Sequence, residues 1–193
     1  MKQTTQAIVL GLRKHSDKLS VLQVYSRTEG RLSLQVYGAM SKHKVRAAYQ
    51  PLSVVEITYD NQPTRTMATL QQIDPLYLPE RIYADVRRQT ISMFVTEMLM
   101  LTLSHPMQDE QMYQFVDDYV HELNDTREPE NMHIEFMLRL AGQLGIGVPE
   151  TIGTPTSRIG RQNELRRLCD YYREHIEAFR APKSLDILIE IFD

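Results

Sequence analysis

A compact run of cations stands directly before an apolar segment of the chain; its members are Lys42, His43, Lys44 and Arg46. Positive side chains this close together can contact the phosphates of a polyanion, because each contact releases a condensed counterion. The run also suits an ordinary hydrophilic loop, since basic loops are common at protein surfaces. The cationic run by itself favours neither interpretation.

Other side chains in the first 79 residues fit the same chemistry. Aromatic rings can stack on nucleic-acid bases while cations follow the phosphate backbone. Tyr37 falls on the polar side of its segment, where a ring is available for stacking, whereas Tyr59 is expected to face the core. The candidate nucleic-acid-binding residues are Arg13, Lys14, Arg27, Arg31, Tyr37, Lys42, Lys44, Arg46 and Arg65.

Glycines and histidines that could support catalysis lack the partners that they need. The glycines between residues 142 and 147 follow a helical pattern and precede no Gly-Lys-Ser/Thr, so they indicate helix termination rather than a phosphate loop. His121-Glu122 lacks the second histidine of a zinc-protease helix. His133 has no ligand side chain at i+4 and is expected at a surface or boundary. These patterns give no reason to expect an enzyme.

The single cysteine, Cys169, excludes an internal disulfide and a cysteine-based zinc site. It falls on the apolar stripe of a helical pattern, so we expect a buried thiol that acts as a small apolar side chain. The sequence therefore predicts neither a metal nor a cofactor. No apolar run is long enough to span a bilayer, and the N-terminus lacks signal-peptide features, which favours a soluble cytoplasmic protein.

Charge is divided unevenly along the chain. Residues 1–79 hold ten Lys/Arg and five Asp/Glu, whereas residues 80–193 hold twelve and twenty. A basic first part and an acidic remainder are typical of a polyanion-binding module joined to a protein-binding module. An uneven distribution of solvated charge is the alternative.

The first 79 residues predict short β-strands. Branched apolar residues and a period of two indicate strands over 5–13, 19–25, from Gly30 onward, over 53–59 and around 66–73. The cationic run would then occupy the loop between the third and fourth strands. Five short strands separated by turn residues favour a small barrel of the OB-fold type.

Residues 80–193 predict helices only. The expected helices cover 80–104, 109–123, 131–144, 162–178 and a last segment that Ser184 would cap; a flexible loop is expected at about 145–160. The predicted fold class is α+β, with an OB-fold domain at 1–79 and a helical domain at 80–193.

Several short motifs occur in a fixed order along nearly the whole chain. They are Ile8-Val9-Leu10, Ser16-Asp17-Lys18, residues 27–31, Ser41-Lys42, Gln50-Pro51-Leu52-Ser53, residues 139–150 and residues 171–188. Their combination resembles the bacterial recombination mediator family RecO. The chain departs from the family pattern in two ways. With one cysteine it cannot form the four-cysteine zinc element that many relatives carry, so we expect no zinc. The segment between Glu150 and Arg161 is also short for the family.

The resemblance implies a protein of recombinational repair. Such a protein binds single- and double-stranded DNA, anneals complementary strands and helps place the RecA recombinase on single strands coated by single-stranded DNA-binding protein, without needing a nucleotide. RecR and single-stranded DNA-binding protein are its implied partners, and the cytoplasmic nucleoid its implied location. A protein–protein adaptor without direct DNA contact remains the alternative function.

The acidic tail of single-stranded DNA-binding protein ends in an apolar residue, so a binding pocket for it should be apolar and bordered by cations. Few cations lie near the last two predicted helices. The candidate partner-binding residues are Arg166, Arg167, Arg180 and Lys183. The alternative is that these cations only balance nearby acids.

Overall fold

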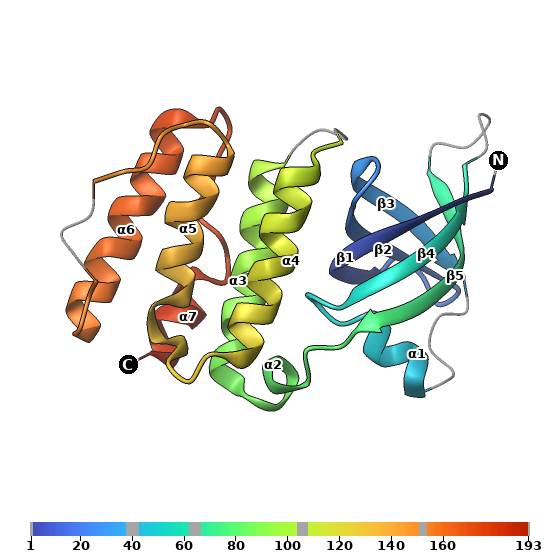
Figure 1. Ribbon diagram of the computed structural model, residues 1–193, viewed down its shortest axis with the longest axis horizontal. Coiled ribbons are helices and arrows are strands. Elements are labelled where there is room, and N and C mark those ends of the chain that lie inside the picture. The colour runs from blue at the N-terminus through green and yellow to red at the C-terminus, as the bar shows by residue number, and fades with distance from the viewer. Residues whose placement is uncertain (1, 38–42, 62–66, 104–107, 151–153, 193) are drawn as a thin grey trace. The chain divides into compact units, whose positions relative to one another are not determined.

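A closed five-stranded barrel forms the N-terminal part of the molecule (Figure 1). The computed structural model describes residues 2–37, 43–61, 67–103, 108–150 and 154–192, and the backbone alone at 43–45. The strands are β1 (Lys2–Lys14), β2 (Leu19–Ser26), β3 (Gly30–Tyr37), β4 (Val54–Asp60) and β5 (Ala68–Tyr77). Their order is β1-β2-β3-β5-β4, and antiparallel pairing of β1 with β4 closes the barrel. The predicted five-stranded OB-fold is confirmed.

The barrel interior is built from alternate residues of each strand. In β3, Leu34 and Val36 are buried in the apolar core while Tyr37 is exposed, as the period of two predicts. Tyr59 is also buried, and its hydroxyl donates a hydrogen bond of 2.5 Å to the Glu29 carboxylate. The side-chain pattern therefore decided which face of each strand points inward.

The segment between β3 and β4 differs from the prediction. Residues 43–48 form a short helix, α1 (His43–Ala48), where a loop was expected. Ala48 and Tyr49 are buried in the barrel core, and the Ser53 hydroxyl donates 2.8 Å to the Ala47 carbonyl. Burial of these small and aromatic side chains stabilises the helix. The charge pattern of the segment does not indicate this burial, so the sequence predicted a loop.

The rest of the chain is helical between its connections. The helices are α2 (Glu80–Ala84), α3 (Val86–Thr102), α4 (Glu110–Asp125), the 3₁₀ turn η1 (Pro129–Asn131), α5 (Met132–Gln143), α6 (Arg158–His175) and α7 (Leu185–Ile191). In the helical unit, α5 contacts both α3 and α6, and α7 contacts α3 (Figure 1). The predicted helical class of this part is confirmed.

The prediction of one continuous helix over 80–104 was wrong, because α2 ends before Asp85 and α3 begins after it. The Asp85 carboxylate accepts backbone hydrogen bonds from Arg87 at 2.8 Å and Arg88 at 3.1 Å. An aspartate in this position satisfies the free N–H groups of a new helix, so α3 starts here. The expected loop is also shorter than predicted, because the Ser157 hydroxyl accepts from the Gly160 amide at 3.1 Å and α6 begins at Arg158.

The chain divides into two compact units. One holds residues 1–79 together with 103–120, and the other holds 80–102 and 121–193. The domain boundary expected after residue 79 stays a prediction. In this division the first part of α4 groups with the barrel. Residues 103–120 carry four acids and no Lys or Arg, so the cation excess of the barrel unit is one instead of five.

Candidate nucleic-acid interface

The strand register places Arg13 and Tyr37 on one outer face of β1, β2 and β3. Arg13 pairs with Val21, and Leu19, two residues earlier on the same strand, pairs with Tyr37. Directly paired residues point to the same side of a sheet, as do residues two apart. Both side chains are exposed, with 58% of Tyr37 accessible. A cation and an aromatic ring therefore share a solvent-facing surface.

Beside Val21, this outer face also carries polar side chains. Gln23 pairs with Ser33 across the strands, and the Ser33 hydroxyl donates 2.9 Å to the Gln23 amide oxygen. Gly11, paired with Gln23 after a bulge in β1, has no other atom within 4 Å of where a Cβ would stand. A ligand backbone can approach closely at such a position. We call the residues Gly11, Arg13, Gln23, Ser33 and Tyr37 the outer face.

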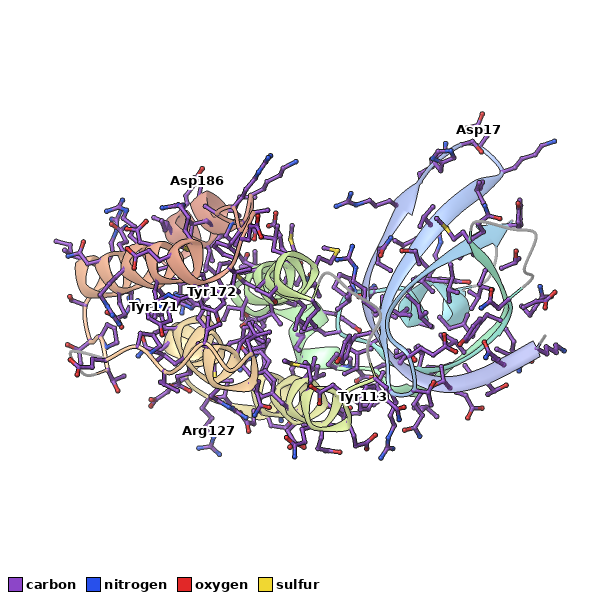
Figure 2. All side chains as sticks on the ribbon, turned by 90° about the horizontal axis from the view of Figure 1, so that it is seen from above. Asp17, Tyr113, Arg127, Tyr171, Tyr172 and Asp186 are labelled. Carbon is purple, nitrogen blue, oxygen red and sulfur yellow. The ribbon has the colours of Figure 1, made fainter. Side chains whose placement is uncertain are left out.

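Lys14 and its neighbours form the exposed turn between β1 and β2. Lys14 Nζ pairs with Asp17 at 2.8 Å, and both side chains are largely exposed, so the pair is weak. Asp17 projects from the tip of this hairpin in Figure 2. Lys18 is exposed next to it. The turn thus continues the positive charge of Arg13 beyond the end of the outer face.

Arg27 and Arg31 do have partners inside the barrel unit. The Arg27 guanidinium donates to the Glu110 carboxylate at the start of α4 and to the Gln6 amide oxygen. Arg31 Nη1 donates 3.2 Å to the Leu103 carbonyl oxygen. Sequence spacing cannot show the contacts with Glu110 and Leu103, because these partners lie more than 70 residues further along the chain. The role of both arginines in DNA binding stays a prediction.

Three of the predicted contacts cannot be placed. Lys42 and Arg65 lie outside the described residues, as does the side chain of Lys44. Arg46 is exposed in the last turn of α1.

The opposite side of the barrel carries acids instead: Glu56 of β4 pairs directly with Asp74 of β5, and both are exposed. Among the described residues, this part of the β4–β5 surface is therefore acidic, whereas the outer face and the β1–β2 turn carry Arg13, Lys14 and Lys18.

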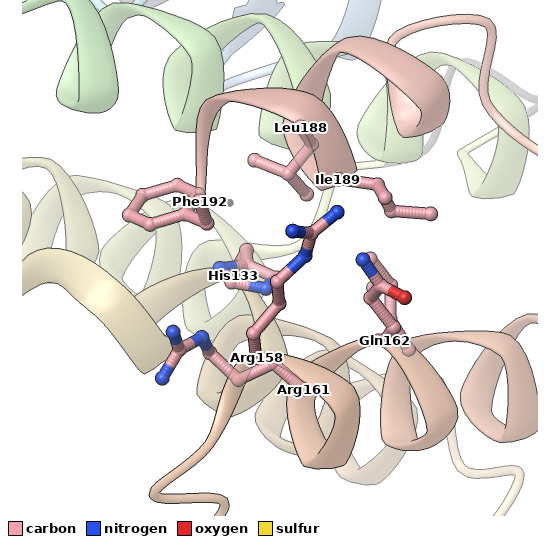
Figure 3. Close-up of a pocket in the computed structure, with 8 residues that line it drawn as sticks. His133, Arg158, Arg161, Gln162, Leu188, Ile189 and Phe192 are labelled. Carbon is pink, nitrogen blue, oxygen red and sulfur yellow. The ribbon is translucent and has the colours of Figure 1, made fainter.

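A second candidate site is an apolar pocket among α5, α6 and α7 (Figure 3). Its free volume for a water-sized group is about 10 Å³, and it is partly open to solvent. On one side α6 contributes the positive residues Arg158 and Arg161. Opposite them α7 contributes the apolar part. The full lining is His133, Arg158, Arg161, Gln162, Leu165, Leu188, Ile189 and Phe192.

His133 is buried in this pocket, which makes its predicted surface or boundary position wrong. It is 2% exposed, stacks on Phe192 at 5.4 Å between ring centroids and meets the edge of Phe94 at 6.3 Å. Its Nδ1 and the Nε of Arg161 are buried without a hydrogen-bond partner. Burial, and then the nearby Arg161 charge, lower the pKa of His133 to about 3. Two unpartnered polar atoms beside apolar walls suit an acidic ligand with an apolar end.

The predicted partner-binding cations do not line this pocket. Arg166 is exposed on α6, while Arg167 pairs with Glu164 at 2.6 Å. Arg167 is nine residues beyond Arg158, two and a half helical turns, and so faces the other way. Arg180 and Lys183 are exposed in the connection to α7. The role of these four cations in partner binding stays a prediction, and the arginines of α6 that line the pocket are Arg158 and Arg161.

Folding of the helical unit should weaken as His133 becomes protonated. Because its folded pKa lies below the ordinary value of 6.5, the unfolded chain binds a proton that the folded chain excludes. Stability is therefore complete above pH 6.5 and falls with decreasing pH, by about 2.6 kcal/mol from pH 7.5 to 4.5. Urea unfolding followed by circular dichroism at 222 nm measures this loss. His133→Phe should flatten it, and an equal pH dependence in both proteins would contradict the assignment.

The Cys169 thiol and the possible metal ligands are the remaining candidates for reactive chemistry. Cys169 is 3% exposed, and burial raises the pKa of its thiol to about 11, so the expected buried thiol is confirmed. Among the described residues, no group of three or more His, Cys, Asp or Glu side chains is placed to hold a metal ion. Within the same ranges, no helix combines the length and apolar character needed to cross a membrane.

Comparison with known proteins gives the same family along the chain. Residues 1–78 match the family model "Recombination protein O N terminal", and residues 83–151 match "Recombination protein O C terminal". The chain is 26% identical to the DNA repair protein RecO of Flavobacterium johnsoniae, with 100% of both chains covered. It is 27% identical to that of Porphyromonas gingivalis strain ATCC 33277, with 98% of each covered.

The alignment with the Flavobacterium protein is longer than this chain. It extends over 236 positions, 43 more than the 193 residues of this chain, so that relative has residues without a counterpart here. The family match, the OB-fold order of the strands and the helical second part agree with one another. The chain belongs to the RecO family of DNA repair proteins.

Proposed function

We propose that this protein is a DNA-binding recombination mediator that uses the outer face of its barrel. In this role it binds single- and double-stranded DNA, anneals complementary strands and helps to load the RecA recombinase, at the nucleoid in the cytoplasm. It acts without a catalytic step and without a nucleotide. The observation that carries the proposal is the shared, exposed surface of Arg13 and Tyr37 on strands β1 to β3.

The chemistry of the outer face suits a nucleic-acid strand. OB-folds bind oligonucleotides on the face of strands 2 and 3 and on the adjoining loops. Arg13 would contact phosphates, Tyr37 would stack on a base, and the Gln23–Ser33 pair would offer hydrogen bonds along the floor. Gly11 leaves room for the backbone of the strand.

We assign the pocket of Figure 3 to the acidic tail of single-stranded DNA-binding protein. Leu188, Ile189 and Phe192 would hold the apolar end of the tail, and Arg158 and Arg161 would face its acids. With RecR as a further partner, these contacts would bring the mediator to coated single strands. A protein–protein adaptor is the competing function, and direct DNA binding separates the two.

Removing Arg13 and Tyr37 together should weaken DNA binding. A lost stacked base costs about 1–3 kcal/mol, so the double variant Arg13→Ala/Tyr37→Ala should bind single-stranded DNA about tenfold or more weakly. The slope of log affinity against log salt should also become shallower by about 0.7, the value for one phosphate contact. Fluorescence anisotropy of a labelled oligonucleotide across a salt series measures both.

The matched control is Lys2→Ala, which removes one exposed cation from the far end of β1, where Lys2 pairs with Asp60. It should change affinity less than the double variant. Equal losses in both would mean that only total charge matters. An unmodified protein that does not bind DNA even at low salt would instead support the adaptor function.

A further inference from the structure

In the turn between β2 and β3, the Arg27 guanidinium is bound by a carboxylate of the same chain. Arg27 Nε donates to both Glu110 carboxylate oxygens, at 2.8 and 3.0 Å, and Nη2 donates to one of them. Nη1 donates 3.0 Å to the Gln6 amide oxygen. The guanidinium also lies over the Tyr113 ring, 5.7 Å from its centroid. All these residues belong to the barrel unit.

A guanidinium held in this way presents the geometry that recognises phosphate. Its N–H groups form a planar fork that fits a carboxylate or a phosphate through two parallel hydrogen bonds. Gln6 of β1 holds it without Glu110, and the Tyr113 ring of α4 packs against it. The carboxylate of Glu110 thus stands where two phosphate oxygens would be accepted.

The pair is accessible to a competing anion. The Arg27 side chain is 44% exposed and that of Glu110 is 51% exposed. Exposed ion pairs contribute little stability, because water and salt screen them. The hydrogen bonds from Arg27 lower the pKa of Glu110, so the acid is ionised at neutral pH and remains a competitor. The charge of Asp109, just before α4, acts on Tyr25, and the charge of Asp117, on α4, acts on Arg27.

We propose that Glu110 is an internal competitor of DNA phosphate at Arg27. DNA that reaches the β2–β3 turn must exchange the carboxylate for one of its phosphates, so the first turn of α4 limits the affinity of the barrel for DNA. This inference rests on the proposed DNA binding and adds a regulated phosphate contact to it. Binding of a partner that draws α4 away from the turn would release Arg27.

Neutralising the competitor should strengthen DNA binding. We expect Glu110→Gln to raise the affinity for a labelled single-stranded oligonucleotide about three- to fivefold at low salt, in keeping with the modest energy of an exposed pair. The salt slope should steepen by about 0.7, since one more phosphate is contacted. Helix α4 should keep its start, because the Asp109 carboxylate accepts the Met112 amide at 2.9 Å in either protein.

Two control variants remove the same charge from the same helix. Glu122→Gln breaks a similar pair, with Arg139, in which the arginine side chain is 40% and the glutamate 48% exposed. Asp118→Asn neutralises an exposed acid within the barrel unit that bonds to Gln114. Neither change affects Arg27, so both should alter affinity less than Glu110→Gln and leave the salt slope unchanged.

A double-mutant cycle with Arg27→Ala completes the test. In the Arg27→Ala background, Glu110→Gln should change affinity no more than Asp118→Asn does. If the unmodified protein binds DNA and Glu110→Gln equals Asp118→Asn in affinity and slope, the competitor is rejected while DNA binding stands. A gain from Glu110→Gln that persists without Arg27 would also reject it. Absence of DNA binding by the unmodified protein at low salt would overturn both.

Discussion

Reversing the charge of Arg158 and Arg161 together is expected to lower the affinity for the acidic tail of single-stranded DNA-binding protein at least tenfold. Both residues line the apolar pocket between α6 and α7, and the Arg161 Nε is buried there without a hydrogen-bond partner. Removing one member of a partly buried charge pair costs about 2–5 kcal/mol, because the other charge stays unpaired. Fluorescence anisotropy of a labelled tail peptide measures the loss.

The matched control reverses Arg166 and Arg180, two exposed cations that lie outside the pocket. This control should bind the tail nearly as well as the unmodified protein. Arg161→Gln provides a milder second variant, which removes the charge without introducing an acid. A large loss in the Arg166/Arg180 variant, with normal binding by the Arg158/Arg161 variant, would move the tail site to the cations first predicted from the sequence.

Replacing Glu97 by Ala should release α7 from the helical unit. The Glu97 carboxylate on α3 accepts three hydrogen bonds at the start of α7: from the Lys183 amide at 2.8 Å, the Ser184 amide at 2.9 Å and the Ser184 hydroxyl at 2.7 Å. Hydrogen bonds to a charged group contribute about 1.5–3 kcal/mol, so we expect a loss of about 2–4 kcal/mol. Hydrogen exchange of the α7 amides should become at least about thirtyfold faster.

The pKa of Glu97 agrees with this role. Burial alone would raise its pKa, but the hydrogen bonds from Ser184 and Lys183 outweigh burial and lower it. The stabilisation is therefore present above the usual carboxyl pKa and is lost as the pH falls through the folded value. Glu190→Ala, which removes an exposed acid from α7 itself, should change stability by less than about 0.5 kcal/mol. Unchanged α7 exchange in Glu97→Ala would contradict the prediction.

Ser184 occupies the predicted N-cap position of α7, and Glu97 explains why its side chain does not cap the helix. The Ser184 side chain makes no capping hydrogen bond in its own helix, because its hydroxyl donates to Glu97 instead. Leu188 and Phe192, in and just after α7, form one wall of the pocket in Figure 3. Because the proposed tail site includes this wall, Glu97→Ala should also weaken tail binding. A residue 87 positions earlier in the chain than Ser184 thus controls this wall.

The sequence by itself determined the class of each half. Alternation of Leu34, Gln35 and Val36 fixed an inner and an outer side of β3, because side chains of a strand point to opposite faces in turn. The same rule placed Tyr37 outside and Tyr59 inside, as observed. Local patterns of this kind depend only on neighbours in the chain, so they can be read before the fold is known.

Only the tertiary structure decided which charged residues meet. Arg27 and Glu110 are 83 positions apart, and Glu97 and Ser184 are 87 apart. Two sides of the pocket in Figure 3 come from α6 and α7, whose facing residues depend on helical phase and on packing within the helical unit. No local pattern encodes these contacts, because a side chain's partner across a fold is set by how whole elements pack. The barrel was therefore predictable from period and turns, whereas the competing acid and the pocket's arginines were not.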